Sequence, residues 1–142
     1  MSNFSEILKE LMQERGLSCE KLAKNLGLKS ATVSRWTLRD YSLKLKNLVM
    51  LADYFNCSIE FLAGRTEKPL SFTPKPRPPF MEQFKYILKT HGVSTYKLDK
   101  ETPVKHVYLN RWRRGGEPLL NTLIILADYL GCTIDQLVGR EN

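Results

Sequence analysis

The 142-residue sequence has few of the residues on which metal centres and disulfide frameworks depend. Its three cysteines, Cys19, Cys57 and Cys132, are far apart and form no CxxC pair, and it has only two histidines, His91 and His106. These numbers and spacings argue against a disulfide framework and against a four-ligand zinc site. We therefore expect no bound metal and no cofactor, and we expect the cysteines to be small core residues.

Long hydrophobic runs are also missing. No window approaches the roughly 18 uninterrupted apolar residues of a membrane-spanning helix, and the first ten residues, MSNFSEILKE, carry acids where a secretory signal is basic and then apolar. The sequence contains no glycine-rich phosphate loop, no GxSxG motif and no HExxH motif. It therefore predicts a cytoplasmic protein that is not an enzyme and does not contact the membrane.

Positive charge is in excess throughout the chain. Twenty-two Lys and Arg stand against 15 Asp and Glu, which gives a formal net charge of +7. Such a balance favours binding to nucleic acid or to anionic lipid. The excess is spread over the whole sequence, so neither end is a basic tail.

The chain contains an internal sequence repeat of two copies. Shifted by 76 residues, positions 4–36 match positions 80–112 at 11 of 33 places, and shifted by 75, positions 48–65 match 123–140 at ten of 18. Between the copies, residues 67–79 hold five of the seven prolines, and proline favours an extended, polyproline-like backbone. We predict an N-terminal domain over 1–66, a proline-rich linker over 67–79 that spans up to roughly 40 Å, and a C-terminal domain over 80–142.

Each copy shows five short helical patterns and no convincing strand. In the first copy the apolar spacing predicts a helix that starts at Phe4 and ends before Gly16, where glycine suits a left-handed helix end. A second helix over about 19–25 has Ser18 as its N-cap, and a third runs over about 30–38. The fourth and fifth helices follow, and the second copy repeats this order.

The string SCEKLAKNLGLKSATVSRW, residues 18–36, resembles the helix-turn-helix of the lambda-repressor-like (Cro and repressor type, XRE) DNA-binding family. The positions that match the family pattern are Ser18, Leu22, Ala23, Gly27, Leu28, Val33, Ser34, Arg35 and Trp36. Residues 51–65 match the later part of the family pattern. The resemblance implies an all-α fold of two tandem five-helix domains. It also implies a sequence-specific regulator of transcription, expected to be a repressor, that binds double-stranded DNA in the bacterial cytoplasm or nucleoid.

The sizes and backbone preferences of these residues explain how the motif positions its third helix. Ala23 is small enough to let the second and third helices approach closely, and Gly27 supplies the positive φ of a tight turn. Val33 and Trp36 are expected to support the third helix from behind. The opposite face of that helix then projects into a major groove about 12 Å wide.

The expected DNA contacts lie at the start of the second helix, on the outer face of the third helix and just beyond it. Amides at the start of the second helix suit a phosphate, arginine suits guanine, and asparagine suits adenine. The predicted contacts are Ser18, Cys19, Lys29, Ser30, Ala31, Thr32, Ser34, Arg35, Arg39, Lys44 and Lys46 in the first copy, and Lys105, His106, Val107, Tyr108, Asn110, Arg111, Arg113 and Arg114 in the second.

The second copy departs from the family pattern at two positions. Asp99 replaces the small alanine, and Pro103 replaces the turn glycine although proline cannot adopt a positive φ. We expect the turn to be rebuilt, with Thr102 extended, and Asp99 to be exposed or paired with Lys105 or Arg111, because an unpaired buried carboxylate is costly.

These departures leave two alternatives open. Only the first copy binds DNA while the second copy is a dimerisation or protein-docking module, or the whole chain is a protein-binding regulator of the antirepressor or antitoxin kind. Tyr108 fits a groove contact and a protein interface equally well. If both copies bind DNA, one chain supplies two DNA-reading domains, here called reading heads. Relatives with one such domain per chain obtain two of them by dimerising.

Overall fold

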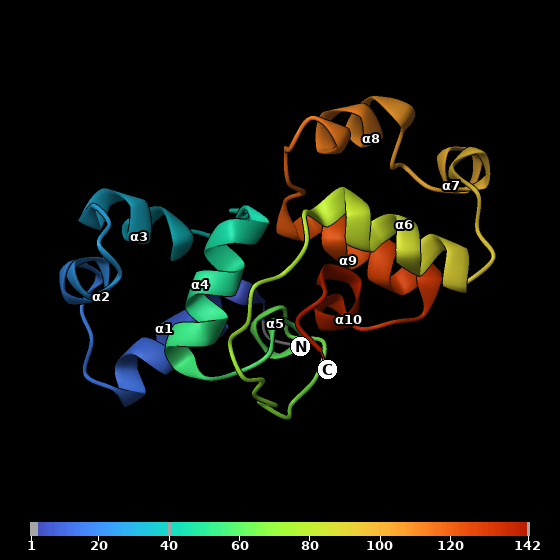
Figure 1. Ribbon diagram of the computed structural model, residues 1–142. Coiled ribbons are helices and arrows are strands. Elements are labelled where there is room, and N and C mark those ends of the chain that lie inside the picture. Colours follow the sequence, from blue (N-terminus) through green and yellow to red (C-terminus); the bar gives the residue numbers. More distant parts are fainter. Residues whose placement is uncertain (1–2, 40, 142) are drawn as a thin grey trace. The chain divides into compact units, whose positions relative to one another are not determined.

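The computed structural model describes residues 3–39 and 41–141, and helices joined by short turns and extended segments make up this part of the chain. Their bounds are α1 Phe4–Glu14, α2 Cys19–Leu26, α3 Ser30–Trp36, α4 Leu45–Phe55, α5 Ile59–Leu62, α6 Phe80–Thr90, α7 Thr95–Glu101, α8 His106–Arg113, α9 Leu120–Leu130 and α10 Ile134–Val138. No strand occurs among these residues. The expectation of an all-α fold with five helices in each copy is confirmed (Figure 1).

The chain divides into two compact units. The first consists of Met1–Leu43 and Asn47–Ser71, and the second of Lys44–Lys46 and Phe72–Asn142. Helices α1 to α5, apart from the first two residues of α4, therefore belong to the first unit, and α6 to α10 belong to the second.

Local signals set the helix ends of the first unit. The Ser18 hydroxyl accepts a hydrogen bond from the Lys21 amide at 3.1 Å, which satisfies a donor at the start of α2 that has no partner within the helix. Ser58 caps α5 in the same way through the Phe61 amide. Gly16 and Gly27 adopt φ values of +62° and +72°, as predicted for helix ends.

Helix α3 ends at Trp36, two residues earlier than predicted. The Thr37 amide bonds to the Ser34 carbonyl and the Leu38 amide to the Arg35 carbonyl, which are three-residue rather than four-residue spacings. The Thr37 hydroxyl also donates to the Ser34 carbonyl at 2.6 Å. These turn-type bonds terminate the helix.

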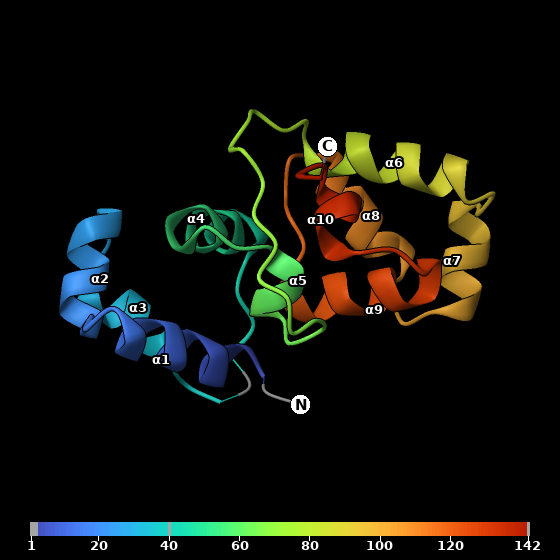
Figure 2. The ribbon, with the colours of Figure 1, turned by 90° about the horizontal axis from the view of Figure 1, so that it is seen from below.

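Helices α7 and α10 of the second unit also begin at side-chain N-caps. Ser94 caps α7 through the Lys97 amide at 3.1 Å. Thr133 and Gln136 form a reciprocal capping box at α10, in which each side chain accepts a hydrogen bond from the other residue's amide. Helix α6 packs against α8 and α10, and these three helices lie together in Figure 2.

An aromatic cluster forms the core behind α8. The rings of Phe80 and Phe84 meet the Trp112 indole edge-on, with ring centroids 5.1 and 5.8 Å apart. In the first unit, Trp36 is 1% exposed and Val33 is fully buried. Both tryptophans are therefore core residues, as the sequence predicts, and each supports the inward side of a third helix.

The proline-rich segment contains neither helix nor strand, and it bends at Glu67 and Lys68. Residues 72–79 belong to the second unit, where the two terminal guanidinium nitrogens of Arg77 contact the Glu117 carboxylate at 3.0 and 3.3 Å. Nearby, the Arg140 guanidinium lies 5.7 Å from the centroid of the Phe72 ring. Residues 72–79 are thus part of the second unit's surface, while the linker bounds of 67–79 stay a prediction.

Candidate nucleic-acid interface

In the first unit, α2 and α3 form a closely packed pair. Ala23 is 1% exposed, so no larger side chain separates the two helices. The chain reverses at Gly27, and the Leu28 amide bonds back to the Ala23 carbonyl at 2.8 Å. Figure 1 shows α2 and α3 side by side. A small residue and a positive-φ glycine therefore produce this turn, as expected.

Helix α3 has two distinct faces. Val33 and Trp36 are buried, whereas Ser30, Ala31 and Arg35 are exposed. Ser34 is exposed as well, and Thr32 has intermediate exposure. The outward face carries small side chains and one guanidinium group, which leaves the helix backbone accessible to a partner.

The remaining predicted contacts of the first copy fall into two groups. Ser18 is exposed, Cys19 is partly exposed, and Lys29 and Arg39 lie exposed at the two ends of α3. Lys44 and Lys46 are exposed too, but they belong to the second unit. The structure therefore brings four of these residues to the helix pair of the first unit.

In the second unit, α7 and α8 lack the close packing of α2 against α3. Thr102 is extended, with φ −131° and ψ 164°, and it is buried. Its hydroxyl donates to the Leu98 carbonyl at 2.7 Å and accepts from the Val104 amide at 3.0 Å. The predicted rebuilding of the turn around Pro103 is confirmed, and Thr102 supplies the bonds that stabilise it.

Asp99 has a role that the sequence did not reveal. Its carboxylate accepts a hydrogen bond of 2.7 Å from the His106 amide, the first residue of α8, and so acts as an N-cap from seven residues away. Lys105 lies 3.9 Å from the same carboxylate and also bonds to the Asp99 carbonyl. Of the two expected partners, Lys105 is confirmed.

The outward face of α8 is larger and more basic than that of α3. Lys105, His106, Asn110, Arg113 and Arg114 are exposed, Val107 is 60% exposed, and Tyr108 is 37% exposed. Arg111 is exposed as well, and its guanidinium lies 5.7 Å from the centroid of the Tyr108 ring.

Contacts along α8 hold two of these side chains in place. The Asn110 side-chain oxygen accepts a hydrogen bond from Arg113 at 2.7 Å. The Tyr108 ring stacks on Trp112, with centroids 6.5 Å apart and planes at 20°. The face is therefore ordered by its own contacts as well as by the core behind it.

A shallow pocket of about 520 Å³ borders the C-terminal end of α8. Arg113, Arg114 and Lys85 line it, with Glu82 as the acid among the lining residues. Lys85 lies on α6 and was not among the predicted contacts. The repeat gave no signal for it, because the equivalent residue of the first copy, Lys9, was not a predicted contact either. Three cations beside α8 suit an anionic backbone.

The fourth helix of each unit is tied to the first helix of its helix pair, α2 or α7, through a repeated tyrosine. Asn25 donates to the Tyr54 hydroxyl at 3.0 Å, and in the second unit the Tyr129 hydroxyl donates to the Glu101 carboxylate at 2.9 Å. Desolvation, with the bond to Glu101 and its charge, raises the pKa of Tyr129 above its ordinary value of 10. At neutral pH the hydroxyl therefore stays a donor.

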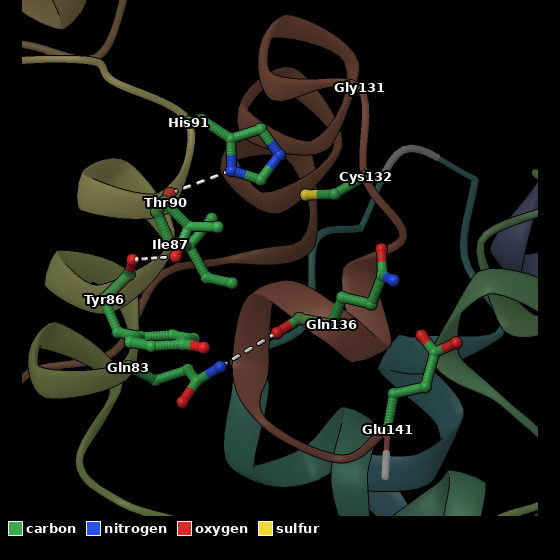
Figure 3. Close-up of a pocket in the computed structure, with 9 residues that line it drawn as sticks. All are labelled: Gln83, Tyr86, Ile87, Thr90, His91, Gly131, Cys132, Gln136 and Glu141. Carbon is green, nitrogen blue, oxygen red and sulfur yellow. Dashed lines mark hydrogen bonds between the residues drawn. The ribbon is translucent and has the colours of Figure 1, made fainter.

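A second pocket, of about 510 Å³, lies on the second unit between α6 and the start of α10 (Figure 3). Gln83 reaches across it and donates to the Gln136 carbonyl at 3.1 Å. At the pocket's edge, the His91 ring nitrogen lies 2.9 Å from the Ile87 carbonyl of its own helix. Cys132 and Glu141 complete this side of the lining.

In the first unit an arginine stands where His91 stands in the second. Arg15 donates to the carbonyls of Tyr54 and Phe55 at the end of α4, at 3.4 and 3.3 Å. Its guanidinium also lies 5.0 Å from the centroid of the Phe55 ring. Histidine is too short to make the equivalent bridge to the end of α9.

The cysteines only partly follow their prediction. Cys57 is 2% exposed, as expected of a core residue, but Cys19 and Cys132 have intermediate exposure. The expectation of burial is wrong for these two, because Cys19 is the first residue of α2 and Cys132 lines the groove near His91. Within residues 3–39 and 41–141, no cluster of three or more His, Cys, Asp or Glu side chains could hold a metal ion.

None of the helices in the described part of the chain is long and apolar enough to cross a bilayer.

A family model described as helix-turn-helix matches residues 8–62. A second, described as the Cro/C1-type HTH DNA-binding domain, matches residues 83–142. The two matches follow one another along the chain and together include all the helix pairs described above. No curated protein and no solved structure matches the chain significantly.

Proposed function

The chain belongs to the Cro- and repressor-type family of helix-turn-helix DNA-binding regulators of transcription, whose domain it carries twice in tandem, and from this premise we propose a sequence-specific repressor. It inserts α3 of the first unit, and α8 of the second, into the major groove of double-stranded DNA. Exposed cations at the ends of both helices contact the phosphates on either side of the groove.

One observation carries this proposal: the outward face of α3. Ser30, Ser34 and Arg35 are exposed on a helix whose other side is fixed by Val33 and Trp36. A rigid helix with an accessible face is what base reading in the major groove needs. Arginine on such a face pairs bidentately with guanine.

The second unit supports a second reading head. Helix α8 also has its back in the core, at Leu109 and Trp112, and its exposed face carries donors and cations. Residues 105–116 contain no acidic residue, and they contain one lysine and three arginines. Such a surface suits the negatively charged phosphate backbone of DNA.

Two single substitutions in the full chain test the proposal. Operator fragments are first selected from randomised duplexes, and affinity for them is then measured at fixed salt by fluorescence anisotropy. Arg35→Ala is expected to weaken specific binding by about 1–3 kcal/mol, or about 5- to 150-fold, because a bidentate base contact is lost. Arg111→Ala is expected to have an effect of the same order.

Lys68→Ala is the matched control. Lys68 is exposed beyond α5, so this variant removes one positive charge and leaves both helix pairs unchanged. Loss of affinity in all three variants alike would contradict base reading by Arg35. An effect of Arg35→Ala without any effect of Arg111→Ala would instead favour the alternative in which the second unit docks a protein or a second copy of the chain.

A further inference from the structure

The two reading helices can be compared position by position, because the repeat aligns them with a constant shift of 76. Both begin at equivalent residues, Ser30 and His106, and both bury equivalent residues behind them. Differences on their outward faces are therefore differences in what each helix presents, not in how it is placed on its own unit.

At the exposed positions, one residue is kept and the others change. Arg35 and Arg111 are equivalent and identical. The pairs that differ are Ser30 and His106, Ala31 and Val107, and Ser34 and Asn110, all six of which are exposed. The arginine is common to both faces, while its neighbours differ in size and in hydrogen-bonding groups.

These differences have different consequences for base contacts. Serine hydroxyls and the Ala31 methyl group are short, so α3 makes contacts only where its backbone comes close to the base edges. On α8, the Val107 side chain is 60% exposed and presents an apolar surface suited to a thymine methyl group. Asn110 presents a side-chain amide, which is suited to adenine. The oxygen of this amide already accepts a hydrogen bond from Arg113.

We infer that the binding site of this protein on DNA is composite: two unlike half-sites that share the base pair read by Arg35 and Arg111 and differ at the neighbouring pairs. A symmetric dimer presents two identical faces and matches a palindrome. This chain presents two different faces, so it binds an asymmetric site in one orientation. The inference rests on the proposed function, because it requires both helices to read bases.

Selection of duplexes with the full chain tests the inference directly. The expected result is two enriched blocks of different sequence, with one guanine position in common. A palindrome, two identical blocks or a single block would each overturn the inference. Absence of any enriched sequence would refute the proposed function itself, so the two failures are distinguishable.

Exchange of the exposed residues between the faces gives a sharper test. The variant His106→Ser, Val107→Ala, Asn110→Ser puts the first face on α8, and the reciprocal variant is Ser30→His, Ala31→Val, Ser34→Asn. Thr32 stays unchanged because its exposure is only intermediate, and Tyr108 because its ring stacks on Trp112. Only exposed positions are altered, and circular dichroism checks that each variant keeps its helices.

Each exchange is expected to convert one selected block into a copy of the other. At a duplex with two first-type blocks, the variant with the exchanged α8 should bind about 5- to 150-fold more tightly than the unaltered chain, the range expected for a single matched base pair. Unchanged blocks in both folded variants would overturn the inference, because the exposed residues would then not determine the sequence that is read.

Discussion

The first unit closes its helix pair with two small residues, Ala23 and Gly27, whereas the second unit separates the pair and fastens it with the side chains of Asp99 and Thr102. What the two units share is the support behind the reading helix, a tryptophan and an aliphatic residue in the core. The comparison indicates that the core, more than the turn, holds α3 and α8 in place. The turn can therefore vary if its backbone bonds are satisfied.

The largest effect is expected when the first unit receives the second unit's residue at the tight contact. Ala23→Asp places a carboxylate where α2 meets α3 and where the native side chain is 1% exposed. We expect a loss of about 3–5 kcal/mol in the free energy of unfolding, because the charge is buried without a partner. Urea denaturation followed by circular dichroism measures it.

Ala23→Ser is the control for Ala23→Asp, since it adds a small polar group without charge. If Ala23→Asp unfolded no more easily than Ala23→Ser, the close packing of α2 on α3 would not be required, and the comparison between the units would lose its basis.

A smaller effect is expected from the reverse change. Asp99→Ala removes the cap of α8 and should cost about 0.5–2 kcal/mol, the usual effect of losing an N-cap. Asp99→Asn keeps a side-chain oxygen and is expected to restore most of this loss. Hydrogen exchange at the first amides of α8 reports the change locally. Equal protection in the native chain and in Asp99→Ala would show that the cap contributes nothing.

The smallest effect concerns the residues that follow the first helix of each copy. His91→Arg is expected to stabilise the second unit by about 0.3–1 kcal/mol, since a cation near a helix C-terminus is favourable, and to fill the groove beside α10. Arg15→His should destabilise the first unit by a similar amount. Thermal unfolding of both variants measures the difference, and no change in either one would mean that the Arg15 bridge is without energetic effect.

Local signals made much of this structure predictable. Ser18, Ser94 and Gly27 define helix ends through bonds within three residues, and the repeat transferred each assignment to the other copy. The extended Thr102 followed from Pro103 by sterics alone. The outward face of α3 followed from the burial expected of Val33 and Trp36.

Contacts between distant residues were not predictable. Asp99 reaches the start of α8 only because the rebuilt turn brings it there. Arg77 and Glu117 pair across 40 residues, and no local pattern indicates a partner for either. Similarly, the bonds of Arg15 to the end of α4 join residues 39 and 40 positions apart, and no local pattern indicates them.

Each unit holds a single tryptophan, directly behind its reading helix. The molecule therefore has one tryptophan fluorophore per unit, and neither lies on the exposed face. Replacing Trp36 by phenylalanine leaves an emission signal from the second unit alone, and the opposite replacement leaves one from the first. Titration of DNA into these two single-tryptophan chains would report the occupancy of each head separately, without an attached dye.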